Sequence, residues 1–260
     1  MSKLHQISSY IEYWLNAVDQ HSLHAPFVYE LYTKVVKNSE DATTYRHIEA
    51  LREKFVHSSK NIQLEDFGAG SAVTKNNIRQ ISNIATYGVT QPRYAQLIHR
   101  ISCFLEVKHA VELGTALGIN TLYMASKRDA QVHTFEGSSQ LCGIAREVFA
   151  GEGMTNIHLI EGNIDDTLPE FIMRSPAIDL AFIDANHRFI PTINYFELLI
   201  KKAHKASCFI FDDIHWSKEM EKAWKHIIQH YSVTLSLDLY QLGLVFFNPE
   251  LRKQHYVLQF

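Results

Sequence analysis

The feature that most constrains the fold of this chain is an apolar run with an acid and two glycines, in residues 111–120. Glu112 lies in the run, and Gly114 and Gly118 follow it four residues apart. A second apolar run ends in Glu136, which is 22 residues beyond Gly114. A strand, a glycine turn, a helix and a strand that ends in an acid are typical of the nucleoside-binding half of a doubly wound α/β fold.

The form of the glycine turn indicates which nucleoside fits. A dinucleotide site requires three glycines in the pattern G-x-G-x-x-G, so that backbone N–H groups and a helix N-terminus meet a pyrophosphate. This turn has only Gly114 and Gly118, and Glu112 just before it would repel a phosphate. A carboxylate there suits a cationic amino group instead. S-adenosylmethionine carries such a group and no phosphate, so we expect it as the cofactor.

Beyond His109 short apolar runs alternate with helical periodicity, which predicts a mostly parallel sheet with helices on both faces. The expected strands are 110–113, 131–135, 157–160, 178–183 and 208–211. The expected helices between them are 118–128, 138–150, 165–173 and 190–203. A helix at 217–230 then precedes two strands at 232–240 and 243–247, whose very short connection makes them antiparallel.

Residues 1–106 have a helical pattern and carry no comparable motif. We therefore expect two domains, a helical extension at 1–106 and a cofactor-binding domain at 107–260. One helix face in the extension is formed by Leu4, Ile7, Ile11, Trp14, Leu15 and Val18. A second acid-glycine sequence at 66–71 follows a poor strand candidate at 61–65, and no strand-ending acid comes after it. We expect this sequence to be a loop between helices.

The composition excludes several classes of protein. The chain has 260 residues, of which 46% are apolar and 20% charged, and its formal net charge is −3, as expected for a soluble globular protein. The sequence has no basic patch of the kind that would indicate a nucleic-acid partner. We expect no membrane association, since no apolar run approaches the roughly 20 residues that span a bilayer. The start lacks a signal-peptide core, and the three cysteines fit buried free thiols, so we expect a cytoplasmic protein.

An ordered set of short motifs gives the chain a resemblance to a known family. The set consists of Glu112-x-Gly114-x-x-x-Gly118, Glu136, Gly162-Asn163, Asp184-Ala185-Asn186-His187 and Asp212-Asp213. With these motifs, residues 107–260 resemble class I S-adenosylmethionine-dependent methyltransferases, and within them the group of catechol and caffeoyl-CoA O-methyltransferases and related bacterial enzymes. The resemblance implies a Rossmann-like seven-stranded sheet whose last strand is antiparallel. It also implies an enzyme that methylates a hydroxyl of a small acceptor, and an extension that covers the acceptor site or forms a homodimer contact.

The first turn provides the expected contacts to the methionine part of the cofactor. Glu112 would hold the amino group, and Gly114 would let the backbone approach the ligand. Gly118 serves close packing as readily as binding. Asn120, by its position in the family, contacts the methionine end or caps the helix.

The next two strand ends provide the expected contacts to the nucleoside. The Glu136 carboxylate can accept hydrogen bonds from both ribose hydroxyls. Gly162 and Asn163 follow the third strand, where the family binds adenine. The alternative interpretation, that Asn163 is an ordinary turn residue, is equally consistent with the sequence. Asp165 and Asp166 are expected to cap the next helix.

Three acids are expected at the ends of two adjacent strands. Asp184 follows one strand, where it serves both the cofactor and catalysis, and Asp212 and Asp213 follow the next. Such carboxylates repel one another unless they are protonated or bridged by a cation, and hard oxygen ligands suit Mg²⁺, with Mn²⁺ and Ca²⁺ as alternatives. The resembled family usually has Asn as the third ligand, so Asp213 leaves the metal's identity open. The alternative is that two of these acids cap the segments that follow.

His187 is the expected general base. The catechol-type enzymes have a Lys three residues after the first metal-binding Asp, and this chain has His187 there. An imidazole titrates near neutral pH and can accept the acceptor's proton. The acceptor is open between a catechol or phenol and an aliphatic hydroxy acid or hydroxyl amino acid. Three alternatives remain: a metal-independent methyltransferase, a nicotinamide-dependent oxidoreductase on the same type of sheet, and a non-catalytic binding protein.

Overall fold

The computed structural model describes residues 3–38, 43–64 and 78–260. Contacts divide the chain into two compact units, and each is described by itself. Residues 1–39 and 175–260 form the first unit, and residues 40–174 form the second. The two domains expected from the sequence, with a boundary after residue 106, are based on motifs and not on contacts. That division stays a prediction.

The second unit is built on three parallel strands. They are β3 (His109–Leu113), β4 (Gln131–Glu136) and β5 (Ile157–Glu161), with β4 in the middle. In the register of the ladder, Leu113 lies opposite Phe135 and Glu136 lies opposite Glu161, so the carboxyl ends of the strands are level. This brings the acid that ends β4 and the glycine turn after β3 to the same edge.

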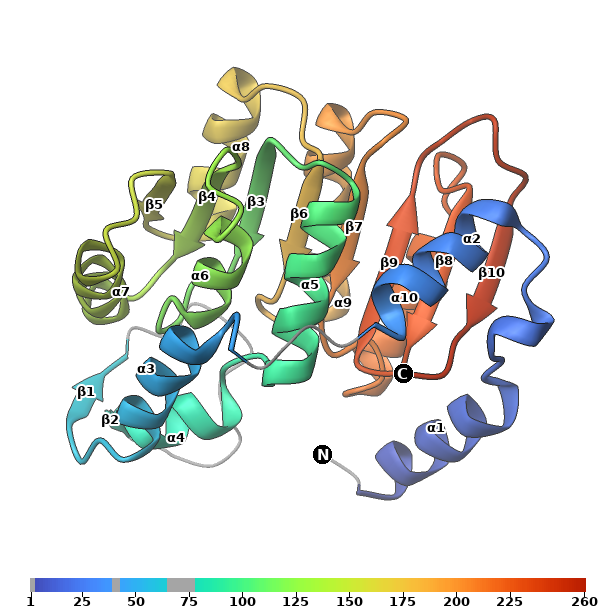
Figure 1. The fold of residues 1–260 in the computed structure, drawn as a ribbon. Coiled ribbons are helices and arrows are strands. Elements are labelled where there is room, and N and C mark those ends of the chain that lie inside the picture. The colour runs from blue at the N-terminus through green and yellow to red at the C-terminus, as the bar shows by residue number, and fades with distance from the viewer. Residues whose placement is uncertain (1–2, 39–42, 65–77) are drawn as a thin grey trace. The chain divides into compact units, whose positions relative to one another are not determined.

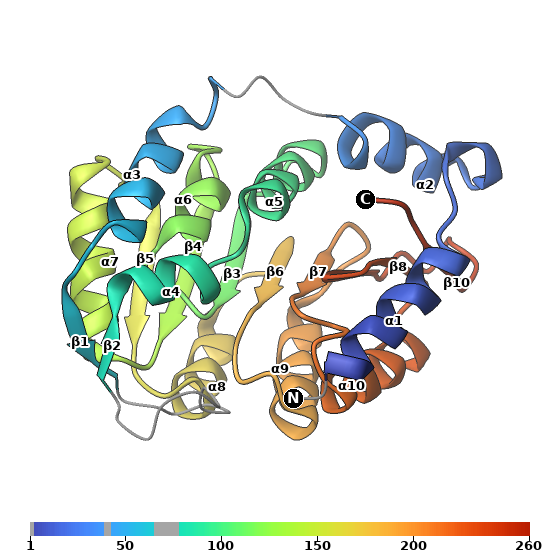
Figure 2. The ribbon, with the colours of Figure 1, turned by 90° about the horizontal axis from the view of Figure 1, so that it is seen from below.

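Helices cover both faces of these three strands. On one face lie α6 (Ile119–Ala125) and α7 (Ser139–Gly151), and on the other lies α8 (Ile164–Arg174) (Figures 1 and 2). The unit also contains α3 (Arg46–Val56), α4 (Ile81–Tyr87), α5 (Pro92–Phe104) and an antiparallel strand pair, β1 (Asn61–Gln63) and β2 (Ile78–Gln80). A shared apolar core joins α3, α4, α6 and α7, with Ile48, Ile84, Leu122 and Phe149 among its buried members.

The first unit has five strands in the order β6-β7-β9-β8-β10. They are β6 (Leu180–Ile183), β7 (Cys208–Phe211), β8 (Leu235–Leu239), β9 (Leu242–Phe246) and β10 (Gln254–Val257). The strand β9 is antiparallel to both β7 and β8, whereas β6 is parallel to β7 and β10 is parallel to β8. Every residue of β6 to β9 is buried, as expected for strands covered on both faces.

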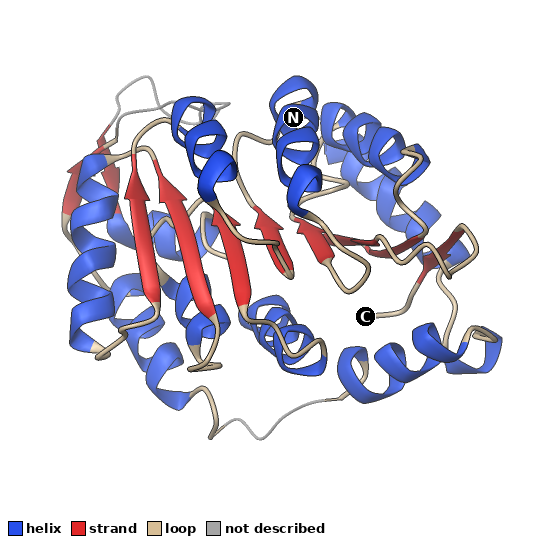
Figure 3. Cartoon of the chain, turned by 90° about the horizontal axis from the view of Figure 1, so that it is seen from above, coloured by secondary structure: helices blue, strands red, loops and turns tan. Residues whose placement is uncertain are grey.

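The helices of the first unit lie on both sides of its strands (Figure 3). On one face α9 (Phe189–Leu199) and α10 (Lys218–Gln229) pack against each other. The N-terminal residues contribute α1 (Lys3–Asn16), a short 3-10 turn η1 (Gln20–Ser22), α2 (Pro26–Leu31) and its π-helical continuation η2 (Tyr32–Val36). A second 3-10 turn, η3 (Ile200–Lys202), continues α9. The Tyr13 hydroxyl donates to the backbone oxygen of Leu258, which ties α1 to the chain beyond β10.

The predicted fold class is confirmed: the chain is α/β, with mostly parallel strands flanked by helices and an antiparallel strand after the last helix. The strand β10 adds to the seven strands that were expected. Residues 61–63 form a strand, so the expectation of a poor strand there was wrong; Ile62 is buried and holds this short pair in place. The acid-glycine sequence at 66–71 lies outside the described residues.

Two further sequence expectations need correction. Cys103 is exposed, unlike the buried Cys142 and Cys208. The first expected helix is α1, but it ends at Asn16, before Val18, and the other five apolar side chains of the expected face are all exposed. No helix in the described part of the chain combines the length and apolar character needed to cross a membrane.

A stacked histidine pair in the second unit predicts an acid-sensitive stability. His133 on β4 and His158 on β5 stack with ring centroids 4.7 Å apart. Burial, together with His158 and His109, lowers the pKa of His133 to about 4 from its ordinary 6.5. Between these pH values the unfolded chain binds a proton that the folded chain does not, so stability falls as the pH drops from 6.5 to about 4. We expect His133→Gln to make this decline shallower in denaturant unfolding; an unchanged slope would contradict the assignment.

Candidate functional site

The turn after β3 uses backbone conformations that favour glycine. Gly114 has a φ of 102°, and Gly118, which precedes α6, has a φ of 77°. The backbone N–H groups of Gly114 and Thr115 both donate to the Phe135 carbonyl, at 3.0 and 3.1 Å. These bonds fix the turn to the end of β4 beside Glu136.

Gly118 is required by packing as well as by conformation. A Cβ atom at this position would lie 2.7 Å from Phe149 Cε1, a buried ring of α7. Of the two roles expected for Gly118, close helix packing is therefore the one that its contacts support.

Substitution at Gly118 is expected to destabilise the second unit strongly. Gly118→Ala combines a left-handed backbone with an overpacked contact, and we expect it to lower the free energy of unfolding by about 2 to 4 kcal/mol. Gly143 in α7 is the matched control, because no atom lies within 4 Å of its added Cβ. Gly143→Ala should raise the free energy of unfolding by about 0.5 to 1 kcal/mol. Equal effects of the two changes in urea unfolding would contradict this reasoning.

Glu112 is fully buried at the centre of a hydrogen-bond network. Its Oε1 accepts from Asn120 Nδ2 at 2.8 Å, and its Oε2 accepts from the hydroxyls of Thr121 and Thr134. Burial raises its pKa to about 7, although the three hydrogen bonds act in the opposite direction. A positive charge close to this network would favour the ionised form.

Asn120 presents the open atom of this network. Its side chain is buried, and no described residue donates a hydrogen bond to its Oδ1. A buried acceptor without a donor costs free energy until a donor arrives. The network of Glu112 and Asn120 therefore fits an ammonium group. Asn120 Oδ1 would bind this group directly, and Glu112 would stabilise it through Asn120. Sequence reasoning selected both residues but could not show that Glu112 acts through Thr121, Thr134 and Asn120.

The Glu136 carboxylate is held in a fixed orientation by the backbone. Its Oε2 accepts from the Ala116 N–H and its Oε1 from the Ser138 N–H, both at 2.9 Å. Burial raises its pKa, and the backbone N–H groups lower it. A carboxylate has about four acceptor positions, so Glu136 can also accept from a ligand hydroxyl.

Ser138 is a candidate that sequence reasoning missed. It is the residue before α7, and its hydroxyl is buried with no hydrogen-bond partner among the described residues. Ser138 lies two residues after Glu136, so the same strand end provides a carboxylate and an unused hydroxyl. A small polar residue at a helix N-cap was the available sequence signal, but this signal is common at helix starts that bind nothing.

The turn after β5 supports the alternative in which Asn163 is an ordinary turn residue and not an adenine contact. Gly162 has a φ of 133°, and its N–H donates to the Glu136 carbonyl at 2.9 Å. Asn163 Oδ1 accepts from the Asp165 N–H at 3.1 Å and so caps α8. Asp165 and Asp166 lie in the first turn of α8, where the helix dipole favours negative charge. An adenine contact by Asn163 would have to use its amide N–H group.

The first unit brings the three predicted acids together. Asp184 follows β6, and Asp212 and Asp213 follow β7. Burial and the neighbouring charges of Asp184 and Asp213 raise the pKa of Asp212 well above its ordinary value. The carboxylates of Asp184 and Asp213 thus repel that of Asp212.

His187 lies within the same cluster. Its Nε2 is 3.2 Å from Asp184 Oδ1. Burial lowers the pKa of His187, and the charge of Asp213 raises it in part. Asn186, His187 and Asp213 have φ values of 69°, 40° and 56°, which are unusual for residues other than glycine. Such strain persists where surrounding structure enforces it, and it is concentrated at functional sites.

The carboxylates of Asp184, Asp212 and Asp213 are suitable ligands for a divalent cation, but their arrangement is not that of a preformed metal site. Carboxylate oxygens are the ligands that Mg²⁺ prefers. Among the described residues, however, no group of three or more His, Cys, Asp or Glu side chains is arranged to hold a metal ion. The metal expected from the sequence therefore stays a proposal.

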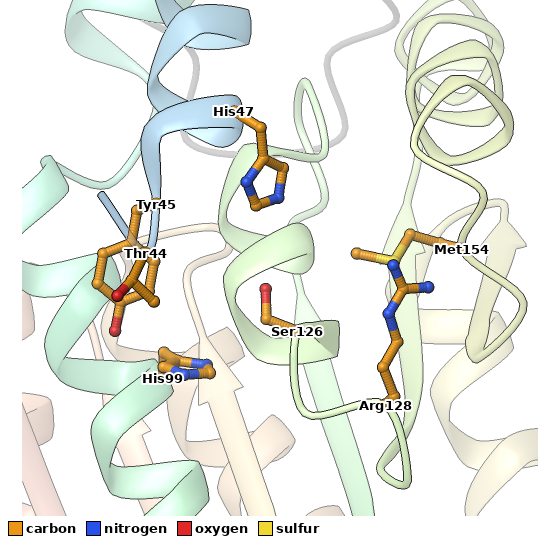
Figure 4. Close-up of a pocket in the computed structure, with 7 residues that line it drawn as sticks. All are labelled: Thr44, Tyr45, His47, His99, Ser126, Arg128 and Met154. Carbon is orange, nitrogen blue, oxygen red and sulfur yellow. The ribbon is translucent and has the colours of Figure 1, made fainter. Parts of the chain in front are cut away.

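Two cavities lie outside the predicted site residues. One, of about 290 Å³, is in the second unit and is lined by Thr44, Tyr45, His47, His99, Ser126, Arg128 and Met154 (Figure 4). The other, of about 450 Å³, is in the first unit between α1, α10 and β10. Its wall includes His215, whose Nε2 lies 2.7 Å from Asp238 Oδ2.

Comparison with known proteins shows what part of this chain resembles. Residues 111–214 match the family described as a methyltransferase domain. The chain is 22% identical over 127 residues to a catechol O-methyltransferase from Niastella koreensis, and this match covers 47% of the chain and 57% of that protein.

Solved structures show the same fold over most of the chain. An O-methyltransferase from Bacillus cereus in complex with S-adenosylhomocysteine has a TM-score of 0.58 at 16% identity, covering 84% of this chain and 97% of its own. The S-adenosylhomocysteine-bound methyltransferase PaMTH1 from Podospora anserina has a TM-score of 0.60 at 16% identity, covering 86% and 97%.

Residues 111–214 therefore match a methyltransferase domain, and the resemblance predicted from the motifs is confirmed. The relative by sequence from Niastella koreensis and the structural neighbour from Bacillus cereus are both O-methyltransferases.

Proposed function

We propose that this protein transfers the methyl group of S-adenosylmethionine to a hydroxyl of a small acceptor molecule. The observation that carries the proposal is the pair of open polar positions beside the turn after β3. Asn120 Oδ1 is a buried acceptor without a donor, and Glu136 is a backbone-oriented carboxylate beside the unused Ser138 hydroxyl. These groups match an ammonium and a ribose. The two structural neighbours from Podospora anserina and Bacillus cereus are described with S-adenosylhomocysteine, which is consistent with this cofactor.

In the proposed mechanism, His187 takes the proton of the acceptor hydroxyl. The acceptor oxygen then forms a bond to the methyl carbon while the bond from that carbon to the cofactor sulfur breaks, which leaves S-adenosylhomocysteine. Asp184, next to His187, orients the imidazole and stabilises its protonated form. Holding oxygen and carbon in line supplies a large part of the rate enhancement.

We further propose that Asp184, Asp212 and Asp213 bind a divalent cation, with Mg²⁺ expected. When bound, such an ion lowers the pKa of a hydroxyl and offsets carboxylate repulsion. The support is the charge of the cluster and the strongly raised pKa of its buried member, Asp212.

Dependence on the metal gives a direct prediction. We expect excess EDTA to reduce methyl transfer and Mg²⁺ to restore it, while the affinity for S-adenosylhomocysteine stays nearly the same, because most of the proposed cofactor contacts come from residues 112–163. Full activity in EDTA would instead favour the metal-independent mechanism with His187 as the base.

The function itself is tested by following labelled methyl transfer from S-adenosylmethionine to catechol, caffeate, lactate and serine. This panel separates phenolic from aliphatic acceptors. Transfer to at least one acceptor, with S-adenosylhomocysteine as coproduct, is the expected result. A thermal-shift titration separates the oxidoreductase alternative, since S-adenosylhomocysteine should raise the melting temperature and NAD should not. Stabilisation by NAD alone would overturn the proposal.

A further inference from the structure

Gln241 makes the one side-chain hydrogen bond to Asp212 that is found among the described residues. Its Nε2 donates to Asp212 Oδ1 at 3.1 Å, and the Asp213 N–H donates to the same oxygen at 2.9 Å. No described residue donates to Asp212 Oδ2. One oxygen of this buried carboxylate is thus fixed by two donors, whereas the other is not fixed by a described donor.

The backbone around Gln241 is held to the loop that carries the acids. Gln241 lies in the short turn between β8 and β9, and its carbonyl accepts from the Ile214 N–H at 3.2 Å. A second tie runs through Asp238, whose Oδ1 accepts from the Tyr240 N–H and whose Oδ2 lies 2.7 Å from His215 Nε2. The turn and the loop therefore form one connected structure, in which the amide of Gln241 has a defined position.

The chemical type of residue 241 suits an orienting role. Asp212 lies beside Asp184 and Asp213, and a carboxylate among like charges tends to rotate away from them. A lysine at this position would hold Asp212 but would also neutralise it. The neutral amide of Gln241 holds one oxygen by a hydrogen bond and leaves the negative charge of the cluster in place.

We infer that Gln241 is a positioning residue, which acts through Asp212 and determines which of its two carboxylate oxygens faces the acceptor. This inference rests on the proposed methyltransferase function. It assigns a role to a residue 28 positions beyond the acid motif, in a turn that has no motif of its own.

The test compares Gln241→Met and Gln241→Glu with the wild-type protein. Methionine removes the donor at similar volume, and glutamate replaces it with a charge that repels Asp212. With the four-acceptor panel and saturating S-adenosylmethionine, we expect Gln241→Met to lower kcat about 10- to 100-fold. Gln241→Glu should lower it further. The KM for S-adenosylmethionine should change by no more than about twofold, since cofactor contacts are intact.

A double-mutant cycle separates positioning from a merely structural role. If Gln241 acts through Asp212, the double variant Asp212→Asn, Gln241→Met should be no slower than Asp212→Asn alone. Gln229→Met, at the exposed end of α10, is the matched control and should keep wild-type kcat. Denaturant unfolding of each variant shows whether a loss of rate follows a loss of stability.

The outcomes are distinguishable. Wild-type kcat in Gln241→Met, or additive losses in the double variant, would overturn the inference and leave the proposed function standing. A loss of rate that follows only the fraction unfolded would also overturn it. If the wild-type protein transfers no methyl group to any acceptor, the proposed function fails, and the inference fails with it.

Discussion

Asp184→Ala is expected to reduce kcat for methyl transfer by about a thousandfold or more. The side chain follows β6, lies 3.2 Å from His187 and adds to the negative charge around Asp212. Its removal leaves the base without its orienting partner and removes a cation ligand, and each of these effects alone commonly costs two or more orders of magnitude.

The affinity of Asp184→Ala for S-adenosylhomocysteine should stay near the wild-type value, because the main cofactor contacts are assigned to Asn120, Glu136 and Ser138. Calorimetry and single-turnover kinetics measure the two properties separately. Asp166→Ala, which changes an exposed acid in the first turn of α8, is the control and should keep its turnover. Wild-type turnover in Asp184→Ala would defeat the proposed role of the acidic cluster.

Glu136→Ala is expected to weaken binding of S-adenosylmethionine about 100-fold or more. The lost carboxylate would have made two charge-assisted hydrogen bonds to the ribose, and hydrogen bonds to charged groups contribute about 1.5 to 3 kcal/mol each. The Ala116 and Ser138 N–H groups also lose their acceptor, so the strand end becomes less ordered. Calorimetric titration gives the change in affinity directly.

Glu161→Ala provides a matched control for this change. Glu161 lies opposite Glu136 in the ladder between β4 and β5, but it is exposed and pairs with Arg146 on the surface. Its replacement should leave cofactor affinity unchanged. Equal affinities of Glu136→Ala and the wild-type protein would refute the ribose assignment.

The sequence was sufficient to predict the alternating strands and helices, because buried parallel strands appear in it as short runs of apolar residues. Asp184, Asp212 and Asp213 were expected at neighbouring strand ends, and the charges of Asp184 and Asp213 do act on Asp212, whereas the roles of the three acids stay predictions. The strands β1, β2 and β10 were not predicted. They are short edge strands with few buried residues, and they depend on tertiary neighbours rather than on their own pattern.

The finer features of the site required the three-dimensional contacts. Glu112 was expected to hold the amino group of the ligand, but its carboxylate is bound by Thr134, which lies opposite it in the ladder between β3 and β4, and by Thr121 on α6. Ser138 and Gln241 have no distinctive sequence pattern, because a serine at a helix start and a glutamine in a turn are both common. Asn163 was open between two roles, and its hydrogen bond to the Asp165 N–H shows that it caps α8.

The most direct measurement is a crystal structure of this protein with S-adenosylhomocysteine bound. The account predicts ribose hydroxyls within hydrogen-bond distance of the Glu136 carboxylate, and the amino group of the ligand on Asn120 Oδ1. A nucleoside bound elsewhere on the protein, or full exposure of Glu136 in the complex, would contradict it.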